Sequence, residues 1–437
     1  MRLKKKEKDK KTLLKAVVAN PDGEIFELEG YAAVGMAGDA FVPLTWNETR
    51  DMPFGSELML MPNRQPVLYN LSRHRFEIVT ENPVIPGEPV YPVAAFNSPG
   101  HLVSYVSAYN ENDGAVYLPL FSYGAVGWSD ERFRTAVIPV DKEKRQDLRW
   151  MRSPDVVAGI KKMKEKMPHN RLRAHLETCA LEYGCPASKN FFLRRYEAPL
   201  PTSPHCNARC LGCLSLQDNE QIPHSQDRIA FEPAPEEIAE VALAHISKVE
   251  RGIVSFGQGC EGDPLLVADT VNAAIGIIRS ETRAGTINMN TNGSRPDKLK
   301  HLFDTGLDSI RISLNSVRKE YYDAYFRPKG YRFSDVKKSI DTALDQNRFV
   351  SINYLNIPGF TDTPEEVDAL MAFLRRHPIN MIQWRNLNFD PIRYWRAMFD
   401  IEGHGPPMGM KRLLSKIRAL FPNLKFGYFN PPKERFK

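Results

Sequence analysis

Residues 204–213 read Pro204-His205-Cys206-Asn207-Ala208-Arg209-Cys210-Leu211-Gly212-Cys213. This stretch places three cysteines at C-x3-C-x2-C spacing in a segment rich in turn-forming residues. The spacing lets all three sulfur atoms converge on one small object without distortion of the backbone. Because cysteines clustered at such short intervals are typical of metal sites, the stretch predicts a metal centre.

Two kinds of metal centre use these ligands. A structural zinc ion takes four Cys or His ligands in a closed tetrahedron. The nearby fourth candidate, His205, adjoins Cys206 too closely to complete such a site easily, which leaves only a residue far away in the sequence. An iron–sulfur cluster accepts the same soft ligands, and a four-iron cluster held by three cysteines keeps one iron open. The spacing therefore favours an iron–sulfur cluster over zinc.

The triplet resembles the cluster motif of the radical S-adenosylmethionine (SAM) superfamily. The resemblance implies that Cys206, Cys210 and Cys213 hold a [4Fe–4S] cluster and that its open iron binds the amino and carboxylate groups of SAM. In this family the residue before the third cysteine is usually aromatic and packs against the adenine. Here that residue is Gly212, so the adenine contact passes to a neighbouring side chain.

From residue 194 onward, apolar strand-like runs alternate with helical runs, as expected of repeated βα units around a parallel sheet. We expect strands at 197–200, 252–257, 286–291, 309–314, 350–355 and 381–387. Helices are expected at 235–249, 265–280, 297–304, 334–346 and 363–376. The predicted fold class is α/β, a partial (β/α)6 radical SAM barrel with an N-terminal β-rich domain. In parallel barrels, reactive groups collect at the carboxyl ends of the strands.

The second expected strand is followed by residues 257–264, Gly-Gln-Gly-Cys-Glu-Gly-Asp-Pro, a literal match to G-x-G-x-x-G. A dinucleotide site would need an acid at the end of the next strand, but Glu281 falls at a helix end. Residues Gly262-Asp263-Pro264 instead resemble the family's Gly-Gly-Glu-Pro motif, which implies contact with the SAM amino group. Asp263 stands where Glu is usual and Glu261 where Gly is usual, so either carboxylate is a candidate. A carboxylate matches an ammonium group, and glycine permits close approach of the backbone.

Further candidate contacts fall at the ends of the later strands. The resemblance places Asn290, Ser313 and Asn315 against SAM. The side chains of Ser313 and Asn315 are expected to point toward the barrel lumen. Gly359 lies in a turn similar to the one that supports adenine. Arg385 is a candidate ligand for a carboxylate or phosphate, since its planar guanidinium matches such groups. For each polar residue the alternative is a structural hydrogen bond, and for Arg385 it is a buried salt bridge.

From the composition and the hydrophobic periodicity, we expect five segments along the chain. These are a basic disordered tail (1–15), a β-rich N-terminal domain (16–150), a helical connector (151–193), the barrel (194–400) and a C-terminal basic cap (401–437). Strand-like runs in the β-rich domain include residues 14–19, 24–28 and 116–121. The Gly- and aromatic-rich stretch 123–128 is interpreted as a packed bend, with a ligand-facing loop as the alternative.

Three further cysteines lie outside the triplet. Cys179 and Cys185 fall on the connector and Cys260 in the loop after the second strand. Either they bind an auxiliary cluster, for which a fourth cysteine is lacking, or they are buried as small hydrophobic residues. Six cysteines in 437 residues do not form a disulfide framework, and their spacing indicates a reducing compartment.

The charge is concentrated at the two ends. The net charge is +6, yet residues 1–15 and 401–437 each carry eight basic and two acidic residues, so the body between them is acidic. Nucleic acid is therefore an unlikely partner. The chain has no apolar leader and no run of about 18 apolar residues, so we expect a cytoplasmic protein without a membrane partner.

The expected function follows from the resemblance, which covers roughly residues 194–400. It implies a radical SAM enzyme that reductively cleaves SAM to methionine and a 5'-deoxyadenosyl radical, which acts on an unknown substrate. An electron donor such as ferredoxin or flavodoxin is the expected partner. The alternatives are an iron–sulfur electron-transfer protein without SAM chemistry and a zinc-stabilised RNA-binding protein.

Overall fold

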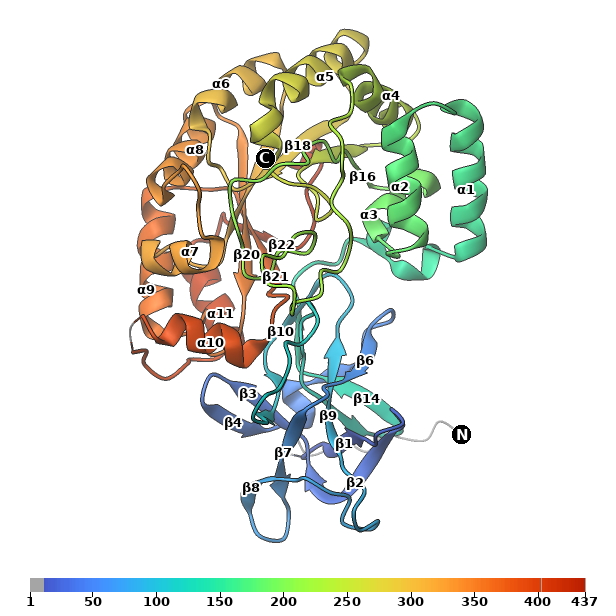
Figure 1. The fold of residues 1–437 in the computed structure, drawn as a ribbon. Coiled ribbons are helices and arrows are strands. Elements are labelled where there is room, and N and C mark those ends of the chain that lie inside the picture. The colour runs from blue at the N-terminus through green and yellow to red at the C-terminus, as the bar shows by residue number, and fades with distance from the viewer. Residues whose placement is uncertain (1–11, 402, 437) are drawn as a thin grey trace, which may run out of the picture. The chain divides into compact units, whose positions relative to one another are not determined.

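The computed structural model describes residues 12–401 and 403–436, which form two compact units (Figure 1). The barrel unit comprises Val140–Leu355, Asp368–Arg385 and the residues from Lys416 onward. The β unit comprises the residues up to Pro139 together with Asn356–Val367 and Asn386–Ser415. Most of the expected tail at 1–15 lies outside the described residues, and the expected domain bounds stay a prediction. No described helix is both long and apolar enough to cross a membrane.

The barrel unit is built on a seven-stranded parallel sheet whose strands follow one another in sequence order. The strands are β16 (Glu197–Pro199), β17 (Ile253–Phe256), β18 (Thr286–Thr291), β19 (Ser309–Leu314), β20 (Phe349–Asn356), β21 (Met381–Asn386) and β22 (Lys425–Gly427). Together with the antiparallel β-rich region at the start of the chain, this half-barrel confirms the predicted fold class.

Strand β22 is one strand more than the six that the sequence predicts. It pairs in parallel with β21, Met381 standing opposite Lys425. A strand of three residues is too short to show an alternating pattern, so the hydrophobic periodicity gave no indication of it. The expected C-terminal cap therefore also supplies an edge of the sheet.

Helices cover the outer face of this sheet. They are α4 (Pro235–Ile246), α5 (Ala268–Glu281), α6 (Pro296–Thr305), α7 (Lys319–Phe326), α8 (Phe333–Asp345) and α9 (Pro364–Arg376). Figure 1 shows α4, α5, α6 and α8 side by side along the curve of the sheet. Helix α6 illustrates how these helices form. It begins with a proline, which suits the first turn, buries Leu299, Leu302 and Phe303 on one face, and ends at Gly306 with a φ of +132°.

Strand β18 shows why polar side chains line one face of the sheet. All six of its residues are buried, and Ile287 and Met289 alternate with Asn288 and Asn290. The two asparagines are hydrogen-bonded to each other at 2.9 Å, so they share a face. Because successive strand side chains point to opposite faces, the asparagines line the face opposite the apolar residues. Burial on both faces is typical of parallel strands.

Three helices precede the barrel strands in the same unit. They are α1 (Ser153–Lys166), α2 (Arg171–Leu181) and α3 (Pro186–Leu193). The Asn170 side chain caps α2 by accepting from the backbone of Arg173 at 2.8 Å, and it donates to Glu240 of α4 at 2.8 Å. Arg171 also forms an ion pair with Glu237 of α4. These polar contacts fix α2 against the first barrel helix.

The β unit consists mainly of short antiparallel strands. They are β1 (Lys15–Ala19), β2 (Ile25–Ala32), β3 (Val34–Ala37), β4 (Ala40–Pro43), β5 (Arg50–Asp51), β6 (Glu57–Leu60), β7 (Arg64–Asn70), β8 (Arg75–Ile78), β9 (Tyr91–Phe96), β10 (His101–Val103), β11 (Val106–Ser107), β12 (Tyr109–Glu111), β13 (Val126–Ser129), β14 (Arg132–Thr135) and β15 (Val137–Pro139). Residues 116–121 were expected to form a strand and are irregular instead. Pro119 lies within them, and proline cannot donate to a sheet ladder. The stretch 123–128, expected to be a packed bend, instead runs into strand β13 from Val126 onward. Gly124, just before that strand, is tightly packed, since a Cβ there would lie 2.5 Å from the side chain of Asn97.

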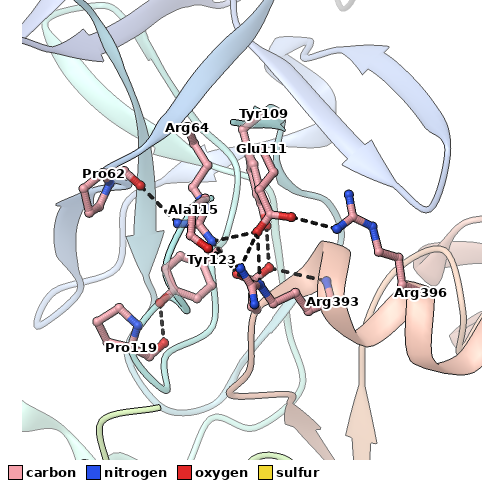
Figure 2. A network of polar contacts seen from close by, with 10 residues as sticks. Pro62, Arg64, Tyr109, Glu111, Ala115, Pro119, Tyr123, Arg393 and Arg396 are labelled. Atoms are coloured by element: carbon pink, nitrogen blue, oxygen red, sulfur yellow. Dashed lines mark hydrogen bonds and ion pairs between the residues drawn. The ribbon is translucent and has the colours of Figure 1, made fainter. Parts of the chain in front are cut away.

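A buried ion cluster joins two segments of the β unit that are distant in sequence (Figure 2). Arg64 of β7 donates to Asp390 at 2.7 Å, and both side chains are fully buried. Tyr109 donates to the same carboxylate at 3.0 Å. Arg393 of helix α10 (Pro391–Phe399) donates to Glu111 at 3.0 Å. The segment after β21, which continues through α10 to helix α11 (Met410–Leu420), is thus fixed to β7 and β12.

Candidate functional site

The cysteine triplet lies in the irregular segment that follows strand β16. All three cysteine side chains are partly buried. The backbone N–H groups of Arg209 and Leu211, within the triplet, donate to carbonyls at the C-terminal end of α7 at 2.9 and 3.0 Å. The loop therefore has a defined position, although it belongs to no helix or strand.

The surroundings of the sulfur atoms suit a metal centre. Burial raises the pKa of Cys206 to about 11 and the pKa of Cys210 well above its usual value. Such thiols are protonated at neutral pH, and they become thiolates when a bound metal cation displaces the protons. Arg228 donates through Nη2 to the Sγ of Cys213 at 3.4 Å. Sequence analysis missed Arg228 because its irregular loop gives no local pattern.

The spread of the three sulfur atoms also bears on the kind of metal. Within the part of the chain that the structure describes, they do not form a group whose ligand atoms all lie within 4.8 Å of one another. Ligands of a single ion must converge closely, whereas the ligands of a cluster bind separate irons. The arrangement therefore fits an iron–sulfur cluster better than one zinc ion.

The loop after β17 is hydrogen-bonded directly to the start of the cysteine loop. The N–H of Gly262 donates to the carbonyl of Ser203 at 2.6 Å, and the N–H of Asp263 donates to the carbonyl of His205 at 2.8 Å. A Cβ on Gly262 would lie 1.8 Å from the oxygen of His205. Only glycine permits this approach, so the Gly-Asp-Pro motif positions the residue that adjoins Cys206.

The two candidate carboxylates, Glu261 and Asp263, are both buried and bind different parts of the site. Glu261 accepts from four backbone N–H groups at 2.6 to 3.0 Å, those of Thr202, Ser203, Gly257 and Gln258. Asp263 accepts from the Thr291 hydroxyl at 2.8 and 2.9 Å, and from the backbone of Asn292 at 2.6 Å and of Leu265 at 3.0 Å. Burial raises the pKa of Glu261 to about 7, against the lowering effect of its backbone donors.

The end of β18 completes this arrangement. The side chain of Asn292 donates to Asn207, inside the cysteine triplet, at 2.8 Å. Asn290, a predicted SAM contact, donates to the carbonyl of Gly257 at 2.9 Å. A Cβ on Gly257 would lie 1.7 Å from the oxygen of Asn290. The loop after β17 is therefore held between the cysteine loop and the end of β18, and Asn290 has a structural bond there.

The predicted contacts at β19 differ in exposure. Ser313 is partly exposed, whereas Asn315 is fully buried and donates to the carbonyl of Tyr321 in α7 at 3.0 Å. Gly359 belongs to the β unit, where its φ is +88° and an added Cβ would lie 1.9 Å from the nitrogen of Gly38. Its conformation is thus required for packing within that unit.

Two arginines line the barrel unit beside each other. Arg311 of β19 donates to Gln383 of β21 at 2.9 Å. Burial, together with the positive charge of Arg385, lowers the pKa of Arg311 to about 9. The Arg385 guanidinium lies 3.8 Å from the centroid of the Tyr428 ring. Arg311 is not among the site residues expected from the sequence, because its partner lies two strands away.

Residues 200–374 match the model of the radical SAM superfamily. Over this segment, which includes the cysteine triplet, the chain matches the radical SAM superfamily. Its relatives include the mitochondrial GTP 3',8-cyclase of Arabidopsis thaliana, 28% identical over 189 residues that cover 43% of this chain and 44% of the relative. The probable GTP 3',8-cyclase of Methanococcus maripaludis is 26% identical over 179 residues, 40% of this chain and 54% of the relative. The chain spans about half the length of the curated relatives it matches.

Solved structures show a distant likeness. Methylornithine synthase is 16% identical, with a TM-score of 0.37 and coverage of 64% of this chain and 77% of that one. Coproporphyrinogen III oxidase from Escherichia coli is described as a radical SAM enzyme. It is 15% identical, with a TM-score of 0.36 and coverage of 52% of each chain.

The radical SAM family implies a [4Fe–4S] cluster and SAM as cofactors. The residues present fit both groups. Three partly buried thiols in one loop supply the soft ligands that iron prefers. Beside them, Gly262 offers a backbone without a side chain and Asp263 a buried carboxylate, which suit a methionyl ammonium group.

Proposed function

We propose that this chain cleaves SAM reductively at a [4Fe–4S] cluster held by Cys206, Cys210 and Cys213, and that the resulting 5'-deoxyadenosyl radical acts on an anionic substrate. The cluster, when bound, supplies the electron for this cleavage. The protein's own residues bind and orient both reactants. An external one-electron donor such as ferredoxin or flavodoxin restores the reduced cluster.

The observation that carries the proposal is the pair of hydrogen bonds between the cysteine loop and the Gly262–Asp263 loop. They bring the three thiols and a buried carboxylate into one fixed assembly. An electron-transfer protein needs the thiols, but it has no need of a carboxylate and a bare glycine backbone at this place. The assembly instead matches a ligand that has both a metal-binding end and an ammonium group.

Asp263 is the carboxylate that we assign to the SAM amino group. All four donors to Glu261 are backbone N–H groups, and these cannot rotate away. One of the donors to Asp263 is the Thr291 hydroxyl, which can rotate to another acceptor and leave the carboxylate free to bind the ligand. Asp263→Asn should weaken SAM binding at least tenfold, measured by equilibrium dialysis on the reconstituted protein.

The anionic substrate is inferred from Arg311 and Arg385. Two neighbouring guanidinium groups repel each other, and a bound carboxylate or phosphate would offset that repulsion. The Nε of Arg311 has no hydrogen-bond partner among the described residues. The distant relatives named as GTP 3',8-cyclases make GTP the first anion to test.

The test is anaerobic reconstitution with iron and sulfide, reduction with dithionite, and addition of SAM, with 5'-deoxyadenosine as the assayed product. We expect about four irons per chain and formation of the nucleoside, both lost in Cys210→Ala. GTP should accelerate nucleoside formation in the parent chain, and Arg311→Gln should remove the acceleration. If GTP has no effect, other phosphorylated and carboxylated compounds are screened for the same acceleration.

Two outcomes would overturn the proposal. If iron binds but SAM neither perturbs the cluster spectrum nor is cleaved, the chain is an electron-transfer protein. If the triplet binds zinc alone and RNA binding weakens steeply with salt, the chain is a zinc-stabilised RNA-binding protein.

A further inference from the structure

A second group of metal-ligating side chains lies in the barrel unit, outside the cysteine triplet. Within residues 12–401 and 403–436, His175, Cys179 and Cys260 place their ligand atoms all within 4.8 Å of one another. His175 and Cys179 lie four residues apart on α2, so they share one face of that helix. Cys260 comes from the loop after β17. The group therefore joins two segments about 80 residues apart in the sequence, as structural metal sites commonly do.

The distances fit one tetrahedral ion. Zinc binds a thiolate at about 2.3 Å and an imidazole at about 2.0 Å, so in a tetrahedron a nitrogen and a sulfur lie about 3.6 Å apart. The Nε2 of His175 is 3.5 Å from the Sγ of Cys179. The Sγ of Cys260 lies within 4.8 Å of both of these atoms. Small hydrophobic residues buried at random would have no reason to converge in this way.

The fourth ligand is available nearby. The backbone N–H of Cys185 donates to the carbonyl of Cys179 at 3.0 Å, which places the two residues beside each other. Its sulfur is near enough to those of Cys179 and Cys260 to interact with them electrostatically. Cys185 lies just before α3, and its sulfur is outside the group of three ligand atoms that lie within 4.8 Å of one another.

We propose that His175, Cys179, Cys185 and Cys260 bind one zinc ion that fixes helix α2 to the loop after β17. One histidine and three thiolates form a closed structural zinc site. An auxiliary iron–sulfur cluster is disfavoured because cluster ligands bind separate irons, whereas three of these ligand atoms converge within 4.8 Å. The site does not depend on SAM chemistry.

The zinc ion would stabilise the candidate active site indirectly. Cys260 directly precedes Glu261, whose carboxylate binds the backbone N–H groups of Thr202 and Ser203 ahead of the cysteine triplet. Fixing Cys260 to α2 therefore also fixes this carboxylate. We expect loss of zinc to loosen the cysteine loop and to lower the amount of iron that the triplet retains.

The first experiment measures metals in the intact chain and in a variant with Cys206, Cys210 and Cys213 all changed to Ala, after growth with added zinc. We expect one zinc per chain in both proteins and loss of iron only in the variant. This design separates the zinc site from the proposed function, since the triplet variant has no SAM chemistry. Absence of zinc from both proteins would overturn the proposal. So would iron beyond four per chain in the intact protein.

The second experiment identifies the ligands. Cys260→Ser and His175→Gln should each weaken zinc binding at least tenfold in competition with a chelator, whereas His169→Gln, at an exposed histidine before α2, should have no effect. If a ligand variant fails to fold, cobalt(II) substitution in the intact chain replaces it. The expected result is the visible absorption of tetrahedral cobalt with thiolate-to-cobalt charge transfer. An octahedral cobalt spectrum, or zinc affinity unchanged in Cys260→Ser, would refute the site.

Discussion

Replacing Gly262 with alanine tests whether the loop after β17 positions the cysteine triplet. The new Cβ would lie 1.8 Å from the His205 oxygen, and real Cβ contacts below 3.0 Å essentially do not occur. The two backbones would therefore separate by more than about 1 Å, a misplacement that can cost about 100-fold in rate. Separation also breaks the two hydrogen bonds of 2.6 and 2.8 Å between the loops. With the polar groups left buried, we expect a loss of about 2–5 kcal/mol in the free energy of unfolding.

The assay compares Gly262→Ala with Gly276→Ala after identical anaerobic reconstitution. Gly276 lies within α5, and an added Cβ there meets only Thr305 Cγ2 at the ordinary distance of 3.8 Å. This control should gain about 0.5–1 kcal/mol of stability from helix propensity and keep its iron content and activity. Gly262→Ala should lose most of its bound iron and about 100-fold in 5'-deoxyadenosine formation. If it retains full iron content and activity within about threefold of the parent, the loop does not position the cysteines.

Two further predictions concern stability. Asp390→Ala leaves the fully buried charge of Arg64 with a weaker partner, so urea unfolding should show a loss of about 3 kcal/mol. The control is Arg396→Ala: the Arg396 side chain is exposed, and its partner Glu111 keeps its ion pair with Arg393, so stability should change by less than about 0.5 kcal/mol. Equal losses in the two variants would contradict the argument. Burial lowers the pKa of His245 to about 4. Between about pH 4 and 6.5 the folded state therefore binds fewer protons than the unfolded state. The stability that the neutral, buried His245 contributes is lost as the pH falls through that window. Relative to His245→Gln, the parent should therefore lose about 2 kcal/mol between pH 7 and pH 5, and parallel pH profiles would refute this.

The sequence predicted those parts of the fold and the candidate site that depend on residues close together in the chain. The cysteine triplet has a fixed spacing, and strands such as β17 and β18 are mostly apolar or fully buried, so the expected strand ends at 257 and 291 lie within one residue of the observed ends at Phe256 and Thr291. Neither Arg228 nor His175 could be found in this way. Arg228 meets the sulfur of Cys213 through the folding of an irregular loop. His175 lies one helical turn before Cys179, but the third member of its group, Cys260, is distant in the sequence.

The sequence also left open which carboxylate near Gly262 serves the ligand, and side-chain length underlies our proposal that it is Asp263. Glu261 has one methylene more than Asp263, and this length lets it accept from backbone groups of two different loops. Asp263 is shorter and stays beside the end of β18. The family motif has Gly at the position of Glu261 and Glu at the position of Asp263. Such a motif records residue types only, so it does not show which backbone groups each side chain is long enough to contact. It follows that Glu261→Asp, which shortens the acid without removing its charge, should loosen the cysteine loop, whereas an acid of either length at 263 would keep its charge next to the ligand.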